Sequence, residues 1–292
     1  MCLVGVSHTG LAADESGLYL GIVGGVGSTG GQGVEQTGVA HKQGSFNGGF
    51  PDFDLKVDVD GSVERSRAGV FGFHSGFRWK TASSLKPAIE IEGLYHVGSQ
   101  ESALQNPDTE VLANIVEWSG QTYSAKYLRT NISDHYGPDE HRFANSMQVR
   151  TTLGMINGVV SYDRGARLKP YLGGGVGLAV IQMKDGVSLQ TSPLNSSSPF
   201  EIDPVSKSDV NHFNSQPDAS DVALAVQAKA GLRSHLTSHV SAFAEYRLIH
   251  VNESNFTFGS TSYVGHSPTD HWNLTSAALN LHNAVVGIDI RF

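Results

Sequence analysis

The last twelve residues of the chain, LHNAVVGIDIRF (281–292), alternate between apolar and polar side chains. The apolar residues share one parity: Ala284, Val286, Ile288, Ile290 and Phe292. The polar residues share the other parity: Asn283, Asp289 and Arg291. A period of two residues indicates a β-strand whose two faces meet different surroundings. The strand continues to a terminal phenylalanine, whereas soluble proteins usually end in a frayed polar tail.

The overall composition is only mildly polar, with a mean hydropathy of -0.18 and a formal net charge of -8. No segment approaches the roughly 20 consecutive apolar residues that a membrane-spanning helix requires. This excludes a helical membrane protein with many spans. A membrane-spanning β-strand needs only about 9–11 residues, of which every second one is apolar. The 20 basic residues are scattered along the chain, so no nucleic-acid partner is expected.

The same alternation recurs upstream and predicts eight strands in all. Their ranges are 17–28, 70–79, 88–97, 146–162, 169–181, 222–233, 240–248 and 279–292. In the fourth strand the period slips near Met155–Gly158, where we expect a β-bulge. The three short connections are 80–87, 163–169 and 234–238. The four long connections, for which we predict no secondary structure, are 29–66, 98–145, 184–219 and 252–278.

Long and short connections alternate strictly along the chain, which is typical of outer-membrane barrels with short periplasmic turns and long external loops. The predicted fold is therefore all-β: an eight-stranded antiparallel up-and-down transmembrane β-barrel with four long external loops. An even number of strands places both termini in the periplasm.

Charged residues predict which face of each strand points inward. In every strand with more than one charge the charges share a parity, as in Glu90 and Glu92 or Glu245 and Arg247. Lys or Arg facing lipid at mid-membrane costs about 2–4 kcal/mol, so this parity should face the lumen. The predicted lumen set is Arg78, Glu90, Glu92, Arg150, Lys229, Arg233, Glu245, Arg247, Asp289 and Arg291. Eight strands enclose just enough space for side chains, so we expect a structural ion-pair ladder, with a narrow ion path as the alternative.

Five stretches carry a resemblance to a known family. They are YLGIVGGVG, KPAIEIEGLYH, KPYLGGGVGLAVI, AGLRSHLTSHVSAFAEYRL and VVGIDIRF. In order and spacing the chain resembles the opacity-protein and OmpA-type family of eight-stranded outer-membrane barrels, which includes bacterial surface antigens. The resemblance implies a location in the outer membrane of a Gram-negative bacterium, among its lipids and lipopolysaccharide. It also implies insertion by the barrel assembly machinery, which would read Val286, Ile288, Ile290 and Phe292.

The family resemblance further implies a structural or adhesive role, with loops that contact a host surface or an envelope ligand. The alternatives are a narrow porin and, third, a lipid-modifying barrel enzyme. The loop aromatics, from Trp118 to Trp272, fit either a binding surface or a cap packed on itself. Trp79, Tyr162, Phe292 and Tyr95 lie at predicted strand ends and suit a membrane interface.

Residues 1–13 resemble the remnant of a truncated signal peptide, because Ala12 and Ala13 precede the charged Asp14. The alternative is a short disordered N-terminus. Residues 14–292 are then expected to form a single barrel domain. The only cysteine, Cys2, lies in the first segment and lacks a lipoprotein motif.

No motif in the sequence indicates catalysis, a cofactor or a metal ion. His74 and Ser75 are adjacent, but neighbours on a strand point to opposite faces and cannot form a nucleophile–base pair. No zinc-ligand spacing, phosphate loop or nucleophile elbow occurs. The histidine pairs His235/His239 and His250/His282 fit either a metal contact or a polar rim. We therefore expect no enzyme, no cofactor and no metal site.

Overall fold

The computed structural model describes residues 16–42, 53–105, 110–111, 115–118, 121–124, 142–191, 210–263 and 268–292. The predicted signal remnant, 1–13, lies outside these ranges, as do parts of all four long connections. Within the described ranges, no helix has the length and apolar character needed to cross a membrane.

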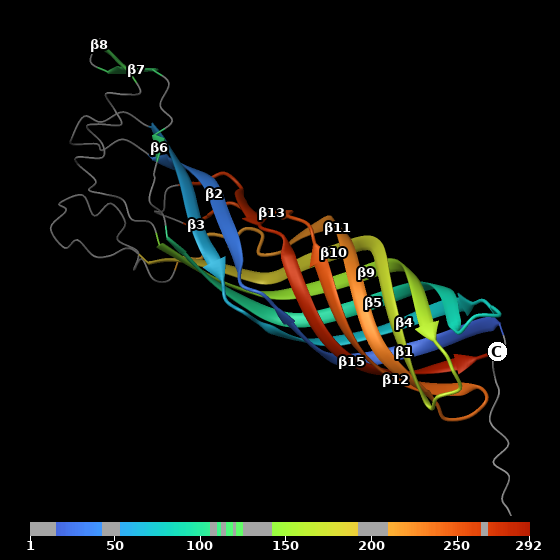
Figure 1. Cartoon of the computed structure of the whole chain (residues 1–292). Coiled ribbons are helices and arrows are strands. Elements are labelled where there is room, and N and C mark those ends of the chain that lie inside the picture. The colour runs from blue at the N-terminus through green and yellow to red at the C-terminus, as the bar shows by residue number, and fades with distance from the viewer. Residues whose placement is uncertain are drawn as a thin grey trace, which may run out of the picture.

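Eight strands form a closed antiparallel ring, as predicted (Figure 1). In ring order they are β1 (Gly17–Thr29), β4 (Arg67–Arg78), β5 (Leu85–Gln105), β9 (Arg142–Tyr162), β10 (Leu168–Thr191), β11 (Ala219–His235), β12 (Val240–Val251) and β15 (Leu279–Arg291). Each strand pairs with the next, and β15 pairs with β1 to close the ring. At this closing seam Ile22 lies directly opposite Ile288. The sheet of the ring therefore has no free edge within the barrel wall.

The long connections are not devoid of secondary structure, and here the prediction was wrong. The additional strands are β2 (Gln32–Lys42), β3 (Phe53–Val63), β6 (Glu110–Val111), β7 (Ile115–Trp118), β8 (Gln121–Ser124), β13 (Ser254–Phe258) and β14 (Trp272–Ser276). Strands β13, β14, β2 and β3 pair in that order and continue onto β5. Because β5 extends beyond its pairing with β4, it offers backbone groups that β3 pairs with. The long-loop end is thus a folded extension of the barrel.

The predicted bulge at Met155–Gly158 is also wrong. Strand β9 pairs without interruption with both neighbours through this stretch. Leu153, Met155 and Val159 point into the barrel, so the apparent slip arises because the lumen is apolar here. The irregularity lies instead in β10, between Lys184 and Val187, where Asp185 has a φ of 53°.

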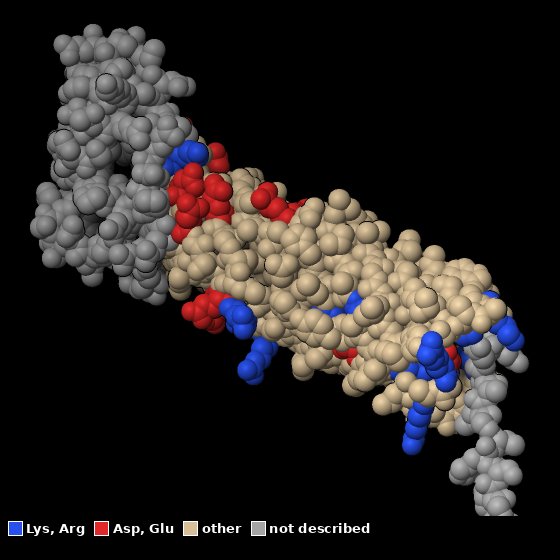
Figure 2. Space-filling view, viewed as in Figure 1, with Lys and Arg blue, Asp and Glu red and all other residues tan. Residues whose placement is uncertain are grey.

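The wall alternates between buried and exposed side chains along every strand of the ring. On the face shown in Figure 2, charged residues gather near the two ends, and the wall between them is mostly uncharged. The outward residues include large apolar side chains such as Ile22, which is 67% exposed, and Phe73, which is 66% exposed. The outer surface of the barrel wall is therefore apolar, whereas a soluble protein buries most of its large apolar side chains.

Candidate functional site

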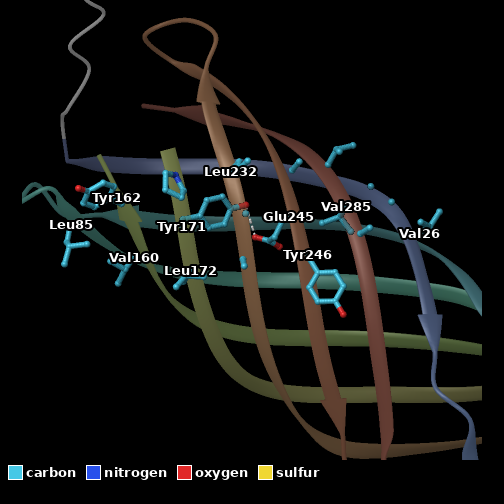
Figure 3. Close-up of a pocket in the computed structure, with 18 residues that line it drawn as sticks. Val26, Leu85, Val160, Tyr162, Tyr171, Leu172, Leu232, Glu245, Tyr246 and Val285 are labelled. Atoms are coloured by element: carbon cyan, nitrogen blue, oxygen red, sulfur yellow. Dashed lines mark hydrogen bonds between the residues drawn. The ribbon is translucent and has the colours of Figure 1, made fainter. Parts of the chain in front are cut away.

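The apolar exterior contains a shallow groove of about 960 Å³ (Figure 3). Its floor consists of small residues on adjacent strands, including Ala230, Ala244 and Ala284. Larger exposed side chains border it: Val26, Leu85, Val160, Tyr162, Leu172, Leu232, Tyr246 and Val286. The groove offers no charged side chain on the outward parity, so it suits flexible hydrocarbon such as lipid acyl chains.

The four residues predicted as an assembly signal all lie on this exterior. Val286, Ile288 and Ile290 are exposed along β15, and Phe292 is 73% exposed just beyond it. Trp79 and Tyr162 are also exposed near the end of the barrel that carries the short turns. This end will be called the short-turn end, and the opposite one the long-loop end.

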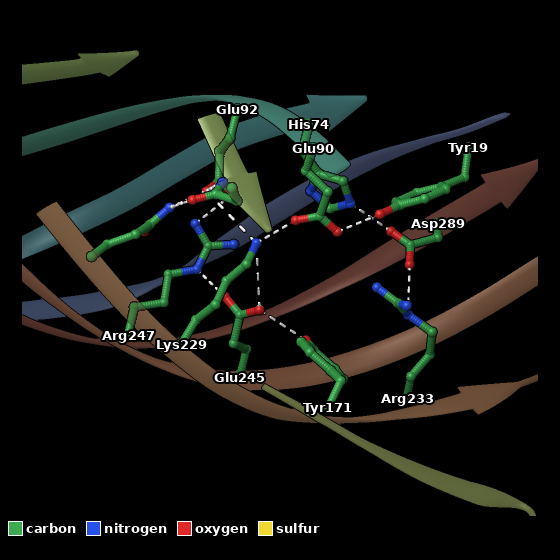
Figure 4. Close-up of polar contacts among 12 residues, drawn as sticks. Tyr19, His74, Glu90, Glu92, Tyr171, Lys229, Arg233, Glu245, Arg247 and Asp289 are labelled. Atoms are coloured by element: carbon green, nitrogen blue, oxygen red, sulfur yellow. Dashed lines mark hydrogen bonds and ion pairs between the residues drawn. The ribbon is translucent and has the colours of Figure 1, made fainter. Parts of the chain in front are cut away.

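The lumen holds a buried ionic network centred on Lys229 of β11 (Figure 4). The Lys229 ammonium pairs with Glu90 and lies 3.9 Å from the Glu92 carboxylate and 4.0 Å from that of Glu245. The Arg247 guanidinium pairs with Glu92 at 2.5 Å and also with Glu245. Two positive charges therefore face three carboxylates inside the barrel.

Uncharged side chains from neighbouring strands complete this network. The Tyr19 hydroxyl donates to Glu90 at 2.5 Å, and the Tyr171 hydroxyl donates to Glu245 at 2.9 Å. The side-chain amides of Asn157 and Gln227 donate to Glu92 at 3.0 and 2.9 Å. Hydrogen bonds to charged groups are roughly twice as strong as neutral ones, so these donors offset part of the cost of burying the carboxylates.

A second cluster lies closer to the short-turn end and centres on Asp289. Its carboxylate contacts His74 Nε2 at 2.8 Å and Arg233 Nε at 2.9 Å. The Arg233 guanidinium also lies over the rings of Tyr171 at 4.8 Å and Tyr19 at 5.7 Å. Cation–π contacts of this kind stabilise a desolvated arginine by about 2 kcal/mol or more. The two clusters therefore place bonded charged side chains from several strands inside the lumen.

The structure brings together most of the predicted lumen set. Seven residues belong to the two clusters: Glu90, Glu92, Lys229, Arg233, Glu245, Arg247 and Asp289. Arg78 and Arg291 share the inward parity nearer the short-turn end, where Arg78 lies 5.3 Å from the centre of the Tyr19 ring. Arg291 donates to the Ser238 carbonyl at 2.7 Å.

The prediction for Arg150 was wrong. Its neighbours Val149 and Thr151 are buried in the lumen, so Arg150 lies on the outward parity of β9, far along the strand toward the long-loop end. The assignment failed because Arg150 is the only charged residue in the predicted strand 146–162 and has no second charge to fix the face. The predicted set omits five further members of the clusters: Tyr19, His74, Asn157, Tyr171 and Gln227. Two of them were open to prediction, because His74 shares the parity of Arg78, and Gln227 shares that of Lys229.

At the long-loop end, buried aromatic side chains pack against one another. We call the folded region at this end, which includes β2, β3, β13 and β14, the cap. Trp272 is 1% exposed; its ring lies 5.7 Å from Phe143 and 5.3 Å from His212, and its indole donates to Thr261 at 3.0 Å. The rings of Phe213 and Phe258 stack at 4.1 Å. For these loop aromatics the structure favours self-packing over a binding surface.

Other loop aromatics have different outcomes. Tyr263 is 37% exposed, and its hydroxyl accepts a hydrogen bond from the Asn211 backbone at 3.2 Å. The side chains of Trp118, Tyr123, Tyr127 and Tyr136 lie outside what the structure describes.

A histidine links three segments of the long-loop end. His41 of β2 contacts Asp54 of β3 at 2.7 Å and Asp270, just before β14, at 3.1 Å. Hydrogen bonds to Asp54 and then to Asp270 raise the pKa of His41 above its ordinary value. We call this group the His41 clamp.

The histidines considered as metal contacts bind other partners instead. His235 contacts Ser241 at 2.6 Å, and His239 contacts Ser238 at 2.8 Å. His250 contacts Asn280 at 2.9 Å, and His282 contacts the hydroxyl of Tyr246 at 2.6 Å. Within the described ranges, no three metal-ligating side chains gather.

Comparisons with known proteins return similar structures only. No protein-family model and no curated protein sequence matches the chain. The crystal structure of Neisserial surface protein A (NspA) is 10% identical, covers 95% of this chain and 98% of its own, and has a TM-score of 0.36. The outer membrane protein OprG from Pseudomonas aeruginosa is 9% identical, covers 95% and 98%, and has a TM-score of 0.44. The outer membrane protease OmpT from Escherichia coli is 9% identical, covers 93% and 97%, and has a TM-score of 0.33. Likenesses this distant do not identify a function.

Proposed function

We propose that the chain is an integral outer-membrane β-barrel protein that anchors a folded, surface-displayed cap. The observation that carries this proposal is a wall that closes on itself while exposing apolar side chains on every strand. Water-soluble monomers rarely expose contiguous apolar patches larger than a few hundred Å². A lipid bilayer removes that penalty, and a closed barrel satisfies every backbone hydrogen bond within it.

In this orientation the short turns and both termini face the periplasm, and the long-loop end faces outward. Insertion would depend on the barrel assembly machinery acting on the exposed side chains of β15. A direct test is a heat-modifiability gel of the outer-membrane fraction. We expect unheated protein to migrate differently from boiled protein and to remain with membranes after extraction with high salt. Protein recovered in the soluble fraction without detergent would contradict the proposal.

The plugged lumen supports an anchor rather than the alternative, a narrow porin. In support of this, the two ionic clusters place bonded side chains inside the ring, and the aromatic side chains at the long-loop end pack against one another. We expect purified protein in planar bilayers to show no stable, ion-selective openings. Reproducible openings that scale with protein and salt concentration would instead establish a pore.

The displayed surface supports a structural or adhesive role for the cap. The outward face of β13 and β14 carries polar ladders, in which Thr257 contacts Asn273 at 3.0 Å and Thr275 contacts Asn255 at 2.9 Å. Such a face is soluble yet rich in hydrogen-bonding groups that can contact a host-cell or envelope ligand. The test is binding of intact bacteria to host cells, with and without replacement of residues 254–276 by a short turn. Equal adhesion would contradict this role, and product formed from labelled lipopolysaccharide or phospholipid would favour a lipid-modifying enzyme.

A further inference from the structure

Four hydrogen-bond donors form a compact patch on the outer wall, on β9 and β10. Arg150 lies directly opposite Gln182, and Gln148 lies directly opposite Lys184. Gln148, Arg150 and Gln182 have buried neighbours on both sides along their strands, so their side chains share the outward parity. Lys184 follows the buried Met183 and shares this parity, just before the irregularity in β10. Directly opposed residues on one face are about 4.5–5.5 Å apart between Cβ atoms, so the four groups are close enough to contact one small ligand. We call these four residues the donor patch.

The donor patch lies at the edge of the apolar wall. Moving toward the short-turn end, the next outward residues on β10 are Val180, Leu178 and Val176, all of which are exposed. On the neighbouring strand β5, Val97 pairs with Arg150 and is also exposed. A lipid-facing arginine costs about 2–4 kcal/mol at the midplane but only about 0–1 kcal/mol near the interface. In the proposed orientation Arg150 lies at the edge of this apolar surface, where an arginine costs little.

The two cations of the donor patch differ in how they are paired. Lys184 pairs with Asp218 at 2.7 Å, and this hydrogen bond is the main reason why the pKa of Asp218 is lowered. Arg150 is near enough to contribute to the same lowering, yet it forms no ion pair with any residue in the described ranges. Asp185 and Glu101 are further exposed acids on this side of the barrel, but no acid in the described ranges pairs with Arg150, so its guanidinium is available. A guanidinium presents a planar fork of donors that matches the oxygens of a phosphate group.

We propose that the donor patch binds the phosphate of a membrane lipid headgroup in the outer leaflet. Arg150 would bind two phosphate oxygens, Lys184 would add charge, and the two glutamine amides would donate further hydrogen bonds. The acyl chains of the same lipid would lie along Val180, Leu178 and Val176. Because the hydrocarbon contact adjoins the patch, the ligand is a phosphorylated lipid rather than free phosphate. This inference rests on the proposed outer-membrane orientation.

The test uses the full chain inserted in phosphatidylcholine nanodiscs that contain bisphosphorylated lipid A, with bound lipid counted by native mass spectrometry. The patch variant is Arg150→Gln with Lys184→Gln. A matched control, Lys56→Gln with Lys80→Gln, removes the same charge from a part-exposed and an exposed position away from the patch. We expect the patch variant to retain at least about tenfold less lipid A, which corresponds to about 1.4 kcal/mol, and the control to match wild type. Wild type should also retain about tenfold less dephosphorylated lipid A than bisphosphorylated lipid A.

The remaining outcomes separate this inference from the proposed function. The lipid site is overturned if wild type retains lipid A and dephosphorylated lipid A equally. It is also overturned if a folded patch variant retains as much lipid A as wild type. Neither result affects the proposal that the chain is a membrane barrel. Binding of inorganic phosphate as tight as that of lipid A overturns the choice of a lipid ligand. If the patch variant does not fold, the comparison of lipid A with dephosphorylated lipid A on wild type tests the phosphate site by itself. Failure of wild type to enter the nanodisc overturns the membrane proposal itself.

Discussion

Lys229→Met removes one of the two positive charges that face three carboxylates in the lumen. In the wild type, Lys229 pairs with Glu90 and lies within 4.0 Å of both Glu92 and Glu245. Methionine fills a similar volume, so little cavity is created and the main change is electrostatic. After substitution Glu90 keeps the hydrogen bond from Tyr19, and Arg247 alone balances the other two carboxylates.

Removing one partner of a buried ion pair costs about 3–5 kcal/mol, because the other charge stays buried without compensation. The double variant Lys229→Met with Glu90→Gln restores the original excess of one negative charge in the cluster. We therefore expect the double variant to lie within about 1–2 kcal/mol of wild type. The coupling between the two positions should be at least 2 kcal/mol, at the upper end of the 0.5–3 kcal/mol range for residues in contact.

The assay is reversible urea unfolding of protein refolded into lipid vesicles, followed by tryptophan fluorescence. Lys56→Met serves as a control, because the Lys56 side chain is 39% exposed and its only ion pair within the described ranges is with Asp58 at 3.7 Å. An exposed pair of this kind contributes about 0–1 kcal/mol. The reasoning would be refuted if Lys229→Met cost less than 1 kcal/mol, or if the double variant were no more stable than the single one.

Three further predictions concern the wall, the cap and the His41 clamp. Ile288→Arg places a charge on the lipid-facing wall, so it should lower stability by about 2–4 kcal/mol and sharply reduce assembly in the outer membrane. Glu253→Arg, in an exposed turn, should leave assembly unchanged. Equal yields of the two variants on heat-modifiability gels would contradict the face assignment. Trp272→Ala should cost about 3–5 kcal/mol in the cap, seen as faster hydrogen exchange there with an intact barrel, and loss of the barrel itself would argue against a separate cap. The pKa of His41 is raised in the folded state, so its clamp should stabilise the cap fully below about pH 6.5 and weaken as pH rises through the raised value. Hydrogen exchange near His41 should therefore accelerate with pH beyond its intrinsic rate, and His41→Gln should abolish the excess.

The ring and its faces could be predicted from the sequence because both depend on local alternation. A strand with two charges on one parity, such as the one containing Glu90 and Glu92, determines its own inward face. Strand β9 contains Arg150 as its only charged residue within the predicted range, so the face of that charge was predicted wrongly. Its inward residues Leu153 and Met155 are apolar, and this break in the alternation was mistaken for a bulge.

The cap and the uncharged part of the lumen network were harder to predict for a different reason. Strand β2 alternates Val34, Gln36, Gly38 and Ala40 toward the interior, but a buried glutamine obscures the pattern. Gln36 is buried because it contacts Asn145 at 2.8 Å and Ser188 at 3.1 Å, residues more than 100 positions away in the sequence. Long-range partners of this kind decide whether a polar side chain can be buried, and a single sequence does not reveal them.

Closure of the ring at the seam between β1 and β15 is the claim on which the membrane assignment depends. Ile22→Cys with Ile288→Cys, in a Cys2→Ser background, places two thiols at directly opposed positions. Opposed residues have Cα atoms about 4.5–5.5 Å apart, within the range that a disulfide spans. Oxidation of the membrane-assembled protein should cross-link this pair nearly completely, and should leave the shifted pair Ile22→Cys with Ala284→Cys unlinked. No cross-link at the opposed pair, or equal cross-linking of both pairs, would show that the first and last strands do not meet in this register.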